Sequence, residues 1–311
     1  MASLDIYLLN VGQADTSVIK TPAGNVIVVD AVQPQKIKNL LNTIRPDGKI
    51  AHLIVTHPHN DHYSAVPSLL NNFQVQRVTL APFWHEPGSP GYHDIINEII
   101  RLDMPVQFLS GYQRIYPDGG TYPNYAGKPE LEMLGPSNAA LEELWESGVL
   151  TPNHLSIITR LTYGQFSIVF AADAQMENWH YYDQEGMLED KIDVLRAAHH
   201  GSKNGSQWER LERLQPKLVV VSSDVSGRHN LPDLVGSAVF FEYNRVEDRA
   251  VALTRDTGTI KIEVADPNSH DRRIVAYGDS PNKGIFPGQE VQLAETDWRE
   301  LLESRMKGPG H

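Results

Sequence analysis

The sequence contains no cysteine, so it can form no disulfide bond and can offer no thiolate to a metal ion. Histidine, aspartate and glutamate are then the side chains left to bind one. No apolar run approaches the roughly 20 residues that a membrane-spanning helix needs. Residues 1–5 also lack the basic start of a signal peptide. These absences together predict a cytoplasmic protein without a membrane partner.

Basic residues are scarce as well. The chain has 39 acidic and 27 basic residues and a formal net charge of −12. This balance argues against a broad surface that binds the phosphates of duplex nucleic acid. A locally positive pocket stays open, because two bound divalent cations would add about four positive charges there. The remaining composition, 41% hydrophobic over 311 residues, suffices for one large α/β domain or two medium ones.

Alternating apolar segments, punctuated by glycine and proline, predict strands and helices in two similar halves. We expect strands at residues 6–9, 16–20, 26–29, 53–55, 78–80, 106–109, 156–162, 166–171, 193–197, 218–222, 251–253 and 259–264. We expect helices at residues 35–43, 63–70, 94–102, 175–185, 208–214 and 235–243. The strands at 251–253 and 259–264 are expected to form a final hairpin, and residues 111–127 a long loop. This pattern predicts two sheets packed face to face with helices outside.

The composition changes after Asp266 toward proline, asparagine, glycine and charged residues. We therefore expect a catalytic domain over residues 1–266. Residues 267–311 are predicted to be a C-terminal arm or tail, with a short helix at residues 295–306.

Three histidines and an aspartate follow the apolar segment 52–55 in the pattern H-x-H-x-D-H. His57 and His59 alternate along the loop, so both rings can reach one metal ion. Asp61 and His62 begin the next helix and can reach a second ion. A polar turn with one helix-capping aspartate is the alternative explanation. The density of ligating side chains favours a pair of divalent ions.

Further ligands are expected on loops that follow other strands. Asp173 ends the apolar segment 166–172, and a carboxylate there can hold two ions about 3.5–4 Å apart. Capping the following helix would explain Asp173 equally well. The adjacent rings of His199 and His200 point in different directions, so we expect only one of them, His200, to bind metal. His154, before the next strand, is predicted to complete the first ion's ligands.

Asp61, His199, Lys203 and His229 are predicted to act in catalysis, and the last three are candidates to contact the substrate. Lys203 follows the His-His-Gly-Ser turn, where its ammonium group can meet an anionic substrate group. Exposure to solvent alone is the alternative for Lys203. His229 follows Arg228 on a loop between a strand and a helix, where the two can stabilise developing negative charge.

Seven segments occur in a characteristic order: NVGQAD at residues 10–15, VVDA at 28–31, the histidine loop, NHLS at 153–156, FAAD at 170–173, HHGS at 199–202 and TRDTGTI at 254–260. In this order the segments resemble the motifs of the metallo-β-lactamase-fold superfamily, and more specifically those of the soluble hydrolase domain of ComEC-like DNA-uptake proteins. The resemblance implies an αββα sandwich that holds two divalent cations. The chain departs from the family pattern in three places. Asn10 replaces an aspartate, Ala172 replaces a glycine, and the segment 230–232 replaces a Gly-His-Pro triplet.

Three functions are compatible with these observations. The first is a phosphodiesterase or nuclease, in which a hydroxide bridging the two ions attacks phosphorus in nucleic acid or a nucleotide. The second is hydrolysis of a small lactam, lactone or thioester, which suits the acidic chain. The third is a catalytically silent binding protein. We expect the first, with zinc or manganese as the cation. The oligomeric state is left open.

Overall fold

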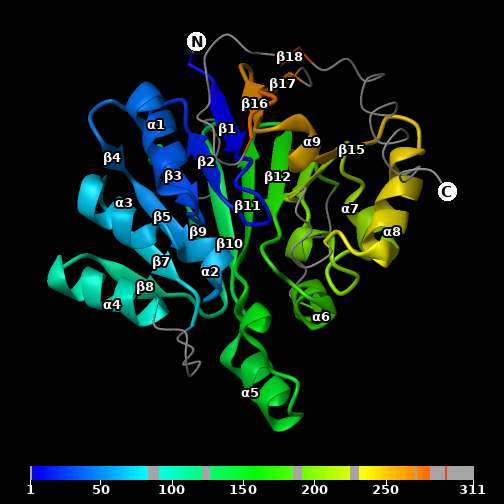
Figure 1. The fold of residues 1–311 in the computed structure, drawn as a ribbon, viewed down its shortest axis with the longest axis horizontal. Helices are drawn as coiled ribbons and strands as arrows, with labels where there is room; N and C mark the ends of the chain where they lie inside the picture. Colours follow the sequence, from blue (N-terminus) through cyan, green and yellow to red (C-terminus); the bar gives the residue numbers. More distant parts are fainter. Residues whose placement is uncertain are drawn as a thin grey trace.

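The computed structural model describes residues 2–82, 91–120, 127–184, 191–224, 231–269, 272–280 and 291–292. Within these residues, two large mixed β-sheets lie face to face at the centre, and helices cover their outer faces (Figure 1). This layering confirms the predicted αββα sandwich. Every helix in the described part of the chain is too short or too polar to span a bilayer.

The first sheet contains most of the N-terminal strands and is antiparallel around β1 but parallel from β3 onward. In spatial order its described strands are β18 (Val291–Gln292), β17 (Arg273–Ala276), β16 (Ile260–Val264), β1 (Leu4–Leu8), β2 (Ser17–Lys20), β3 (Val26–Val29), β5 (His52–Val55), β7 (Val78–Leu80) and β8 (Val106–Phe108). A separate parallel pair is formed by β4 (Lys49–Ile50) and β6 (Gln74–Val75).

The second sheet contains strands of the C-terminal half. It is parallel from β12 to β15 and antiparallel from β9 to β12. In spatial order its described strands are β15 (Ala250–Leu253), β14 (Leu218–Val221), β13 (Val194–Arg196), β12 (Phe166–Phe170), β11 (Ile158–Tyr163), β10 (Glu130–Leu134) and β9 (Tyr112–Ile115).

Helices lie outside and at the ends of this sandwich (Figure 1). Those of the N-terminal half are α1 (Pro34–Ile44), α2 (Asn60–Tyr63), α3 (Val66–Asn72) and α4 (Gly91–Arg101). Those of the C-terminal half are α5 (Asn138–Glu146), the 3₁₀ turn η1 (Pro152–Leu155), α6 (Met176–Gln184), the 3₁₀ turn η2 (Ala198–Gly201), α7 (Trp208–Leu214), α8 (Leu234–Asn244) and α9 (Thr254–Thr257).

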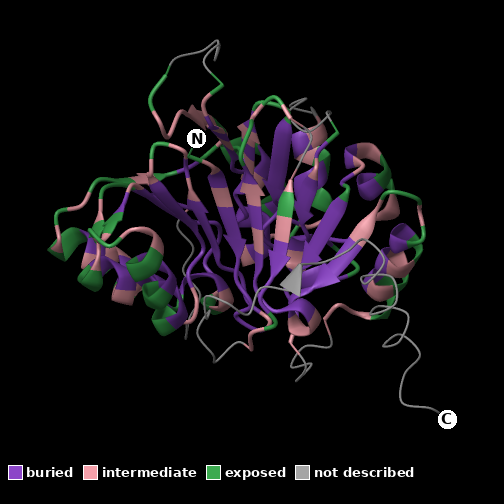
Figure 2. Ribbon diagram, turned by 90° about the horizontal axis from the view of Figure 1, so that it is seen from above, coloured by how far each residue is buried: buried purple, intermediate pink, exposed green. Residues whose placement is uncertain are grey.

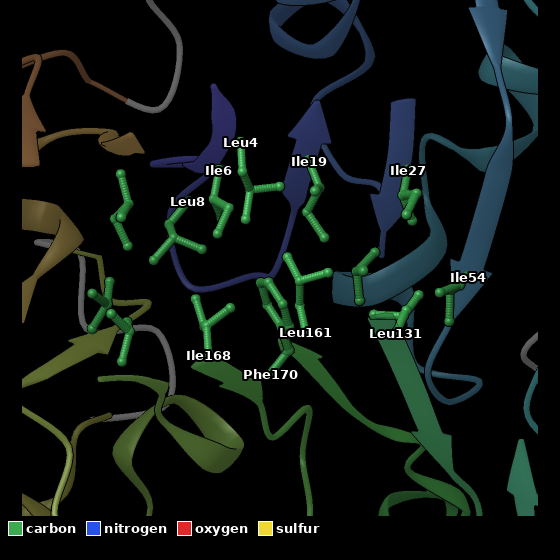
Figure 3. Close-up of a cluster of buried hydrophobic side chains, with 14 of the residues drawn as sticks. Leu4, Ile6, Leu8, Ile19, Ile27, Ile54, Leu131, Leu161, Ile168 and Phe170 are labelled. Carbon is green, nitrogen blue, oxygen red and sulfur yellow. The ribbon is translucent and has the colours of Figure 1, made fainter. Parts of the chain in front are cut away.

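The period of two along the strands explains the layers. In β1, Leu4, Ile6 and Leu8 face the second sheet, whereas Tyr7 joins the core beneath the helices α1, α3 and α4. Figure 3 shows the central cluster, in which residues of β1, β2, β3 and β5 meet residues of β10, β11 and β12. A third cluster lies between the second sheet and α6, α7 and α8. The strands are accordingly the most buried part of the molecule, and exposed residues gather on the outer helices (Figure 2).

Two local predictions are wrong. Residues 251–253 and 259–264 do not form a hairpin, because β15 pairs with β14 in the second sheet and β16 pairs with β1 in the first. The predicted loop 111–127 contains β9, which pairs with β10. The hairpin error concerns pairing with strands elsewhere in the chain, which local sequence does not encode. In the second error, the glycine- and proline-rich composition of residues 111–127 hid a short strand. Residues 121–126 of that loop lie outside the described residues.

The segment after Asp266 contributes to the first sheet, since β17 and β18 extend it beyond β16. Asp279 then forms a buried ion pair with Lys36 of α1. The Lys36 ammonium group also donates hydrogen bonds to the carbonyl oxygens of Asn10, 2.6 Å away, and Ser280, 3.0 Å away. These contacts fix residues 277–280 against the loop that follows β1. The helix expected at 295–306 lies outside the described residues.

Candidate metal centre

The candidate ligands lie on loops at the carboxyl ends of parallel strands, where ligands commonly bind in α/β sheets. The histidine loop follows β5, Asp173 follows β12, and His199 and His200 follow β13. Two groups of these side chains bring their ligating atoms within 4.8 Å of one another: His57 with His59 and Asp173, and Asp61 with His62 and His200. We call them the first position and the second position.

At the first position, the Nε2 atom of His57 lies 3.1 Å from Nδ1 of His59 and 3.6 Å from Oδ2 of Asp173. The Nε2 atom of His199 lies 3.7 Å from the same Asp173 oxygen. Two ring nitrogens thus lie near one carboxylate oxygen, and the ligating atoms of His57, His59 and Asp173 are close enough together to bind a single cation.

At the second position, the other Asp173 oxygen, Oδ1, lies 3.2 Å from Nε2 of His62 and 3.7 Å from Nε2 of His200. His200 Nε2 also lies 3.6 Å from Oδ2 of Asp61. Asp173 therefore stands between the two positions with one oxygen toward each. This is the placement predicted for a bridging carboxylate. The helix-capping alternative is not what the structure shows, since Asn178 rather than Asp173 accepts the Gln175 amide hydrogen at the start of α6.

The buried atoms at this centre fit a bound cation. Oδ1 of Asp173 and the Nε2 atoms of His62 and His200 are fully buried, yet none of them has a hydrogen-bond partner. Burial of unsatisfied polar atoms is costly, and a metal ion is one partner that satisfies all three. We therefore conclude that the described residues fit a divalent ion at the second position.

The charges at the centre are strongly coupled. Burial opposes the ionised form of Asp173, but His62 and His200 hold the pKa of its carboxyl well below its usual range. Burial also opposes a charge on His62, yet Asp173 and Asp30 keep the pKa of its ring well above the ordinary value. Burial and the charge of His62 lower the pKa of His57 far below that value. The side chains of the centre thus place carboxylates and imidazoles of interacting charge in a buried volume.

Asp30 orients the second position from behind. Its Oδ2 atom accepts a hydrogen bond of 2.7 Å from Nδ1 of His62, and both its oxygens accept 2.8 Å bonds from the amide and hydroxyl groups of Thr56. A proton on Nδ1 leaves the Nε2 lone pair of His62 free for a metal. Asp30 lies in one of the motifs that carry the family resemblance, but its role follows only from the structure.

The turns that carry the ligands have unusual backbones. Ala172, His199 and His200 have φ values of 49°, 49° and 51°, in the left-handed region that favours glycine. Such strain in residues other than glycine concentrates at functional sites. At position 172, glycine would adopt this conformation without strain.

The structure does not bring His154 to the cluster. Its Nδ1 atom accepts a 2.9 Å hydrogen bond from the Thr151 amide, so a neutral ring carries its proton on Nε2, which lies 3.4 Å from Glu177. The neighbouring Asn153 contacts the centre instead, with its side-chain nitrogen 3.4 Å from Nε2 of His199.

The structure does not place the other two expected substrate contacts, Lys203 and His229, at the centre. Lys203 is exposed, and its backbone amide donates to the Asp233 carboxylate. It is not among the pocket residues given below. His229 lies outside the described residues, so the structure does not place it.

A pocket of about 890 Å³ opens onto the centre. Its walls come from the loops after β1, β3, β5, β12 and β13 and from the segment after β17. Its described lining residues are Val11, Gly12, Gln13, Ala14, Val32, Gln33, His59, Asn60, Asp61, Ser64, Asp173, His199, His200, Asp224, Leu231 and Ser280. Candidate ligands from both positions thus face one space that is large enough for a small substrate.

Sequence comparison identifies the class of protein. A family model described as the metallo-beta-lactamase superfamily matches residues 9–223. The chain belongs to this superfamily, whose members generally bind two metal ions, and its histidine and aspartate groups are placed for metal binding. Membership supports a metal-dependent hydrolase.

Individual relatives are distant. An 83-residue stretch is 31% identical to ComE operon protein 3 of Bacillus subtilis (strain 168), covering 26% of this chain and only 10% of that protein. Among solved structures, CmlA, a diiron beta-hydroxylase from Streptomyces venezuelae, matches with a TM-score of 0.51 at 15% identity, over 88% of this chain and 54% of that one. The metallo-beta-lactamase fold protein YhfI from Bacillus subtilis matches with a TM-score of 0.50 at 11% identity, over 83% and 99%. At these identities the likeness concerns the fold alone.

Proposed function

We propose that this protein is a dinuclear metal-dependent hydrolase that cleaves phosphodiester bonds in a nucleotide or nucleic acid. The observation that carries the proposal is the position of Asp173. Its two oxygens face separate sets of imidazoles, at 3.6 and 3.7 Å on one side and 3.2 and 3.7 Å on the other. A carboxylate shared in this way is how proteins hold two cations at the short separation that hydrolysis uses.

The residues divide the work between binding the ions and facing the substrate. His57, His59 and Asp173 would hold one cation, and Asp61, His62, His200 and Asp173 the other. Two bound divalent cations lower the pKa of water and offset negative charge on phosphoryl oxygens. His199 lines the pocket with its side chain 22% exposed, so it is a candidate contact for a phosphoryl oxygen. Zinc suits the imidazoles, and the carboxylates also suit manganese.

Support for a phosphodiester substrate comes from the sequence motifs. Their order resembles that of ComEC-like hydrolase domains, and the partial similarity to ComE operon protein 3 is consistent with that resemblance. From the sequence motifs alone, Lys203, which follows the His199–Ser202 turn, and His229 are also proposed to contact the phosphate.

The test compares substrates on one reconstituted protein. Metal-free protein is loaded with zinc or manganese and assayed with bis(4-nitrophenyl) phosphate, a β-lactam and a lactone. We expect metal-dependent cleavage of the phosphodiester and its loss in Asp173→Asn. The matched control is Asp183→Asn, which alters an aspartate paired with Arg210 between α6 and α7. Cleavage of the lactam or lactone alone would refute the proposal, as would a wild-type protein that binds no metal.

The charge of the pocket supports a second candidate. Among the described lining residues are Asp61, Asp173 and Asp224, but no lysine or arginine. A small uncharged lactam, lactone or thioester fits such walls better than a polyanion does. The substrate comparison above decides between the two.

A further inference from the structure

A buried ion pair connects the two sheets close to the centre. Asp15, in the loop between β1 and β2, lies 2.8 Å from the Nη2 atom of Arg196 in β13. Arg196 is 1% exposed and Asp15 is 6% exposed. The hydroxyl group of Ser222, which follows β14, contacts both side chains. The pair therefore joins a loop of the first sheet to two strands of the second.

Stability alone does not explain such a pair. Removing two charges from water costs free energy that their attraction does not always repay, so a buried ion pair is weak evidence for a purely stabilising role. What Asp15 touches besides Arg196 is more informative.

Asp15 contacts candidate ligands from both sheets. Its backbone amide donates a 3.0 Å hydrogen bond to the carbonyl oxygen of Asp61. Its Oδ1 atom lies 3.8 Å from Nδ1 of His200. Asp61 and His200 both belong to the second position, and they come from different sheets. Asp15 is therefore placed to set the distance between them.

The arrangement of Asp15 beside His200 is similar to that of Asp30 beside His62. There, Asp30 accepts the Nδ1 proton and leaves Nε2 for a metal. Both ring nitrogens of His200 are buried without a hydrogen-bond partner. The Nδ1 atom of His200 faces Asp15 at 3.8 Å, while its Nε2 atom faces Asp61 at 3.6 Å and Asp173 at 3.7 Å. Carboxylates that orient ligating histidines in this way tune metal affinity.

We propose that Asp15, held in place by Arg196, is a positioning residue for the second metal ion, because it orients His200 and Asp61 together across the two sheets. The inference rests on the proposed metal centre but not on the identity of the substrate. Its prediction is selective, since the first position has no contact of this kind with Asp15 among the described residues.

The experiment measures metal binding rather than turnover. Wild-type protein, Asp15→Asn and the control Asp183→Asn are stripped of metal and titrated with zinc against a chromophoric chelator. Cobalt(II) absorption spectra report the coordination at each step. For Asp15→Asn we expect one ion bound as in the wild type and the other weakened roughly 10- to 100-fold. Asp183→Asn should bind both ions normally, although it too breaks an ion pair.

Three results would overturn the proposal: two unchanged affinities in folded Asp15→Asn, an equal weakening of both ions, or the same change in Asp183→Asn. If Asp15→Asn does not fold, Ser222→Ala takes its place, because it removes one contact of Asp15 and leaves the charges paired. Ser222→Ala should lower the affinity for one of the two ions. If both affinities equal those of the wild type, the proposal is refuted. A protein that shows this selectivity but cleaves no phosphodiester would refute only the proposed function.

Discussion

The first and second positions share Asp173 but differ in what lies behind their histidines. At the second position, Asp30 accepts a hydrogen bond from His62, and Asp15 lies beside His200. At the first position, the contact of His57 Nδ1 among the described residues is the neutral hydroxyl group of Thr56, 3.2 Å away, and His59 is partly exposed. A carboxylate behind an imidazole fixes its orientation and raises its basicity. We therefore expect the second position to bind its ion more tightly, and the first to exchange its ion more readily.

The largest effect is expected where the two positions meet. Asp173→Asn should lower the affinity for both ions by more than roughly 100-fold, the upper effect typical of residues that only contact a ligand, because each position loses a charged ligand. Metal content after dialysis and chelator competition measure the two losses. A variant that loses only one ion would show that Asp173 belongs to a single position.

Asp30→Asn tests the difference directly. The variant should weaken binding of the second ion roughly 10- to 100-fold and affect the first ion less, because Asp30 contacts His62 directly but is connected to His57 through the Thr56 hydroxyl group. Competition titration in zinc and in cobalt measures both affinities. Equal weakening of both ions would abolish the distinction between the positions.

His52 is expected to make the stability of the fold depend on pH, independently of metal binding. It lies buried in β5, the strand that leads to the histidine loop, and its Nε2 atom is 2.8 Å from the Thr79 hydroxyl. Burial, with a smaller effect of Arg77, lowers the pKa of His52 to about 4. The unfolded chain takes up a proton near pH 6.5 and the folded chain does not. The stability contribution is therefore complete above pH 6.5 and is lost as the pH falls toward 4, by about 2 kcal/mol at pH 5.

We expect His52→Gln to lack this part of the pH dependence. Urea unfolding of metal-free wild type and variant at pH 7.5 and pH 5 measures it, and the gap between the two proteins should narrow at pH 5. A constant gap would mean that His52 titrates normally in the folded protein.

The smallest effect is expected at Ala172. Glycine would relieve roughly 1–2 kcal/mol of left-handed strain but lose a buried methyl group and add chain entropy, so Ala172→Gly should change stability by less than about 1 kcal/mol. Both ions should bind as in the wild type. A tenfold change in either metal affinity, measured by competition titration, would show that alanine rather than glycine at residue 172 alters metal binding.

The sequence signals for this centre were unequal. His57, His59, Asp61 and His62 lie within six residues, so spacing alone indicated their role. Asp173 and His200 could be proposed because each ends an apolar strand, and the ends of parallel strands meet in space. The prediction for His154 rested only on its place before a strand, and that place does not indicate what the ring contacts. Only the fold shows that the ring faces Thr151 and Glu177.

The contacts behind the ligands were beyond prediction for the same reason. Asp15 and Arg196 are 181 residues apart, and nothing local to either residue indicates the other. Strand pairing failed in a similar way. Alternating apolar residues located β15 and β16, but the choice of sheet depends on distant partners, and the two strands joined different sheets.

The ion pair between Lys36 and Asp279 holds a segment beyond the family match against the candidate site. The family match stops at residue 223. Yet Ser280, one residue after Asp279, forms part of the pocket wall. Exchanging the stretch after residue 266 for that of a relative would keep every proposed ligand and still reshape the entrance. We expect such chimeras to retain their metals and to differ in which molecules they accept, which makes this stretch a natural place for selectivity to diverge.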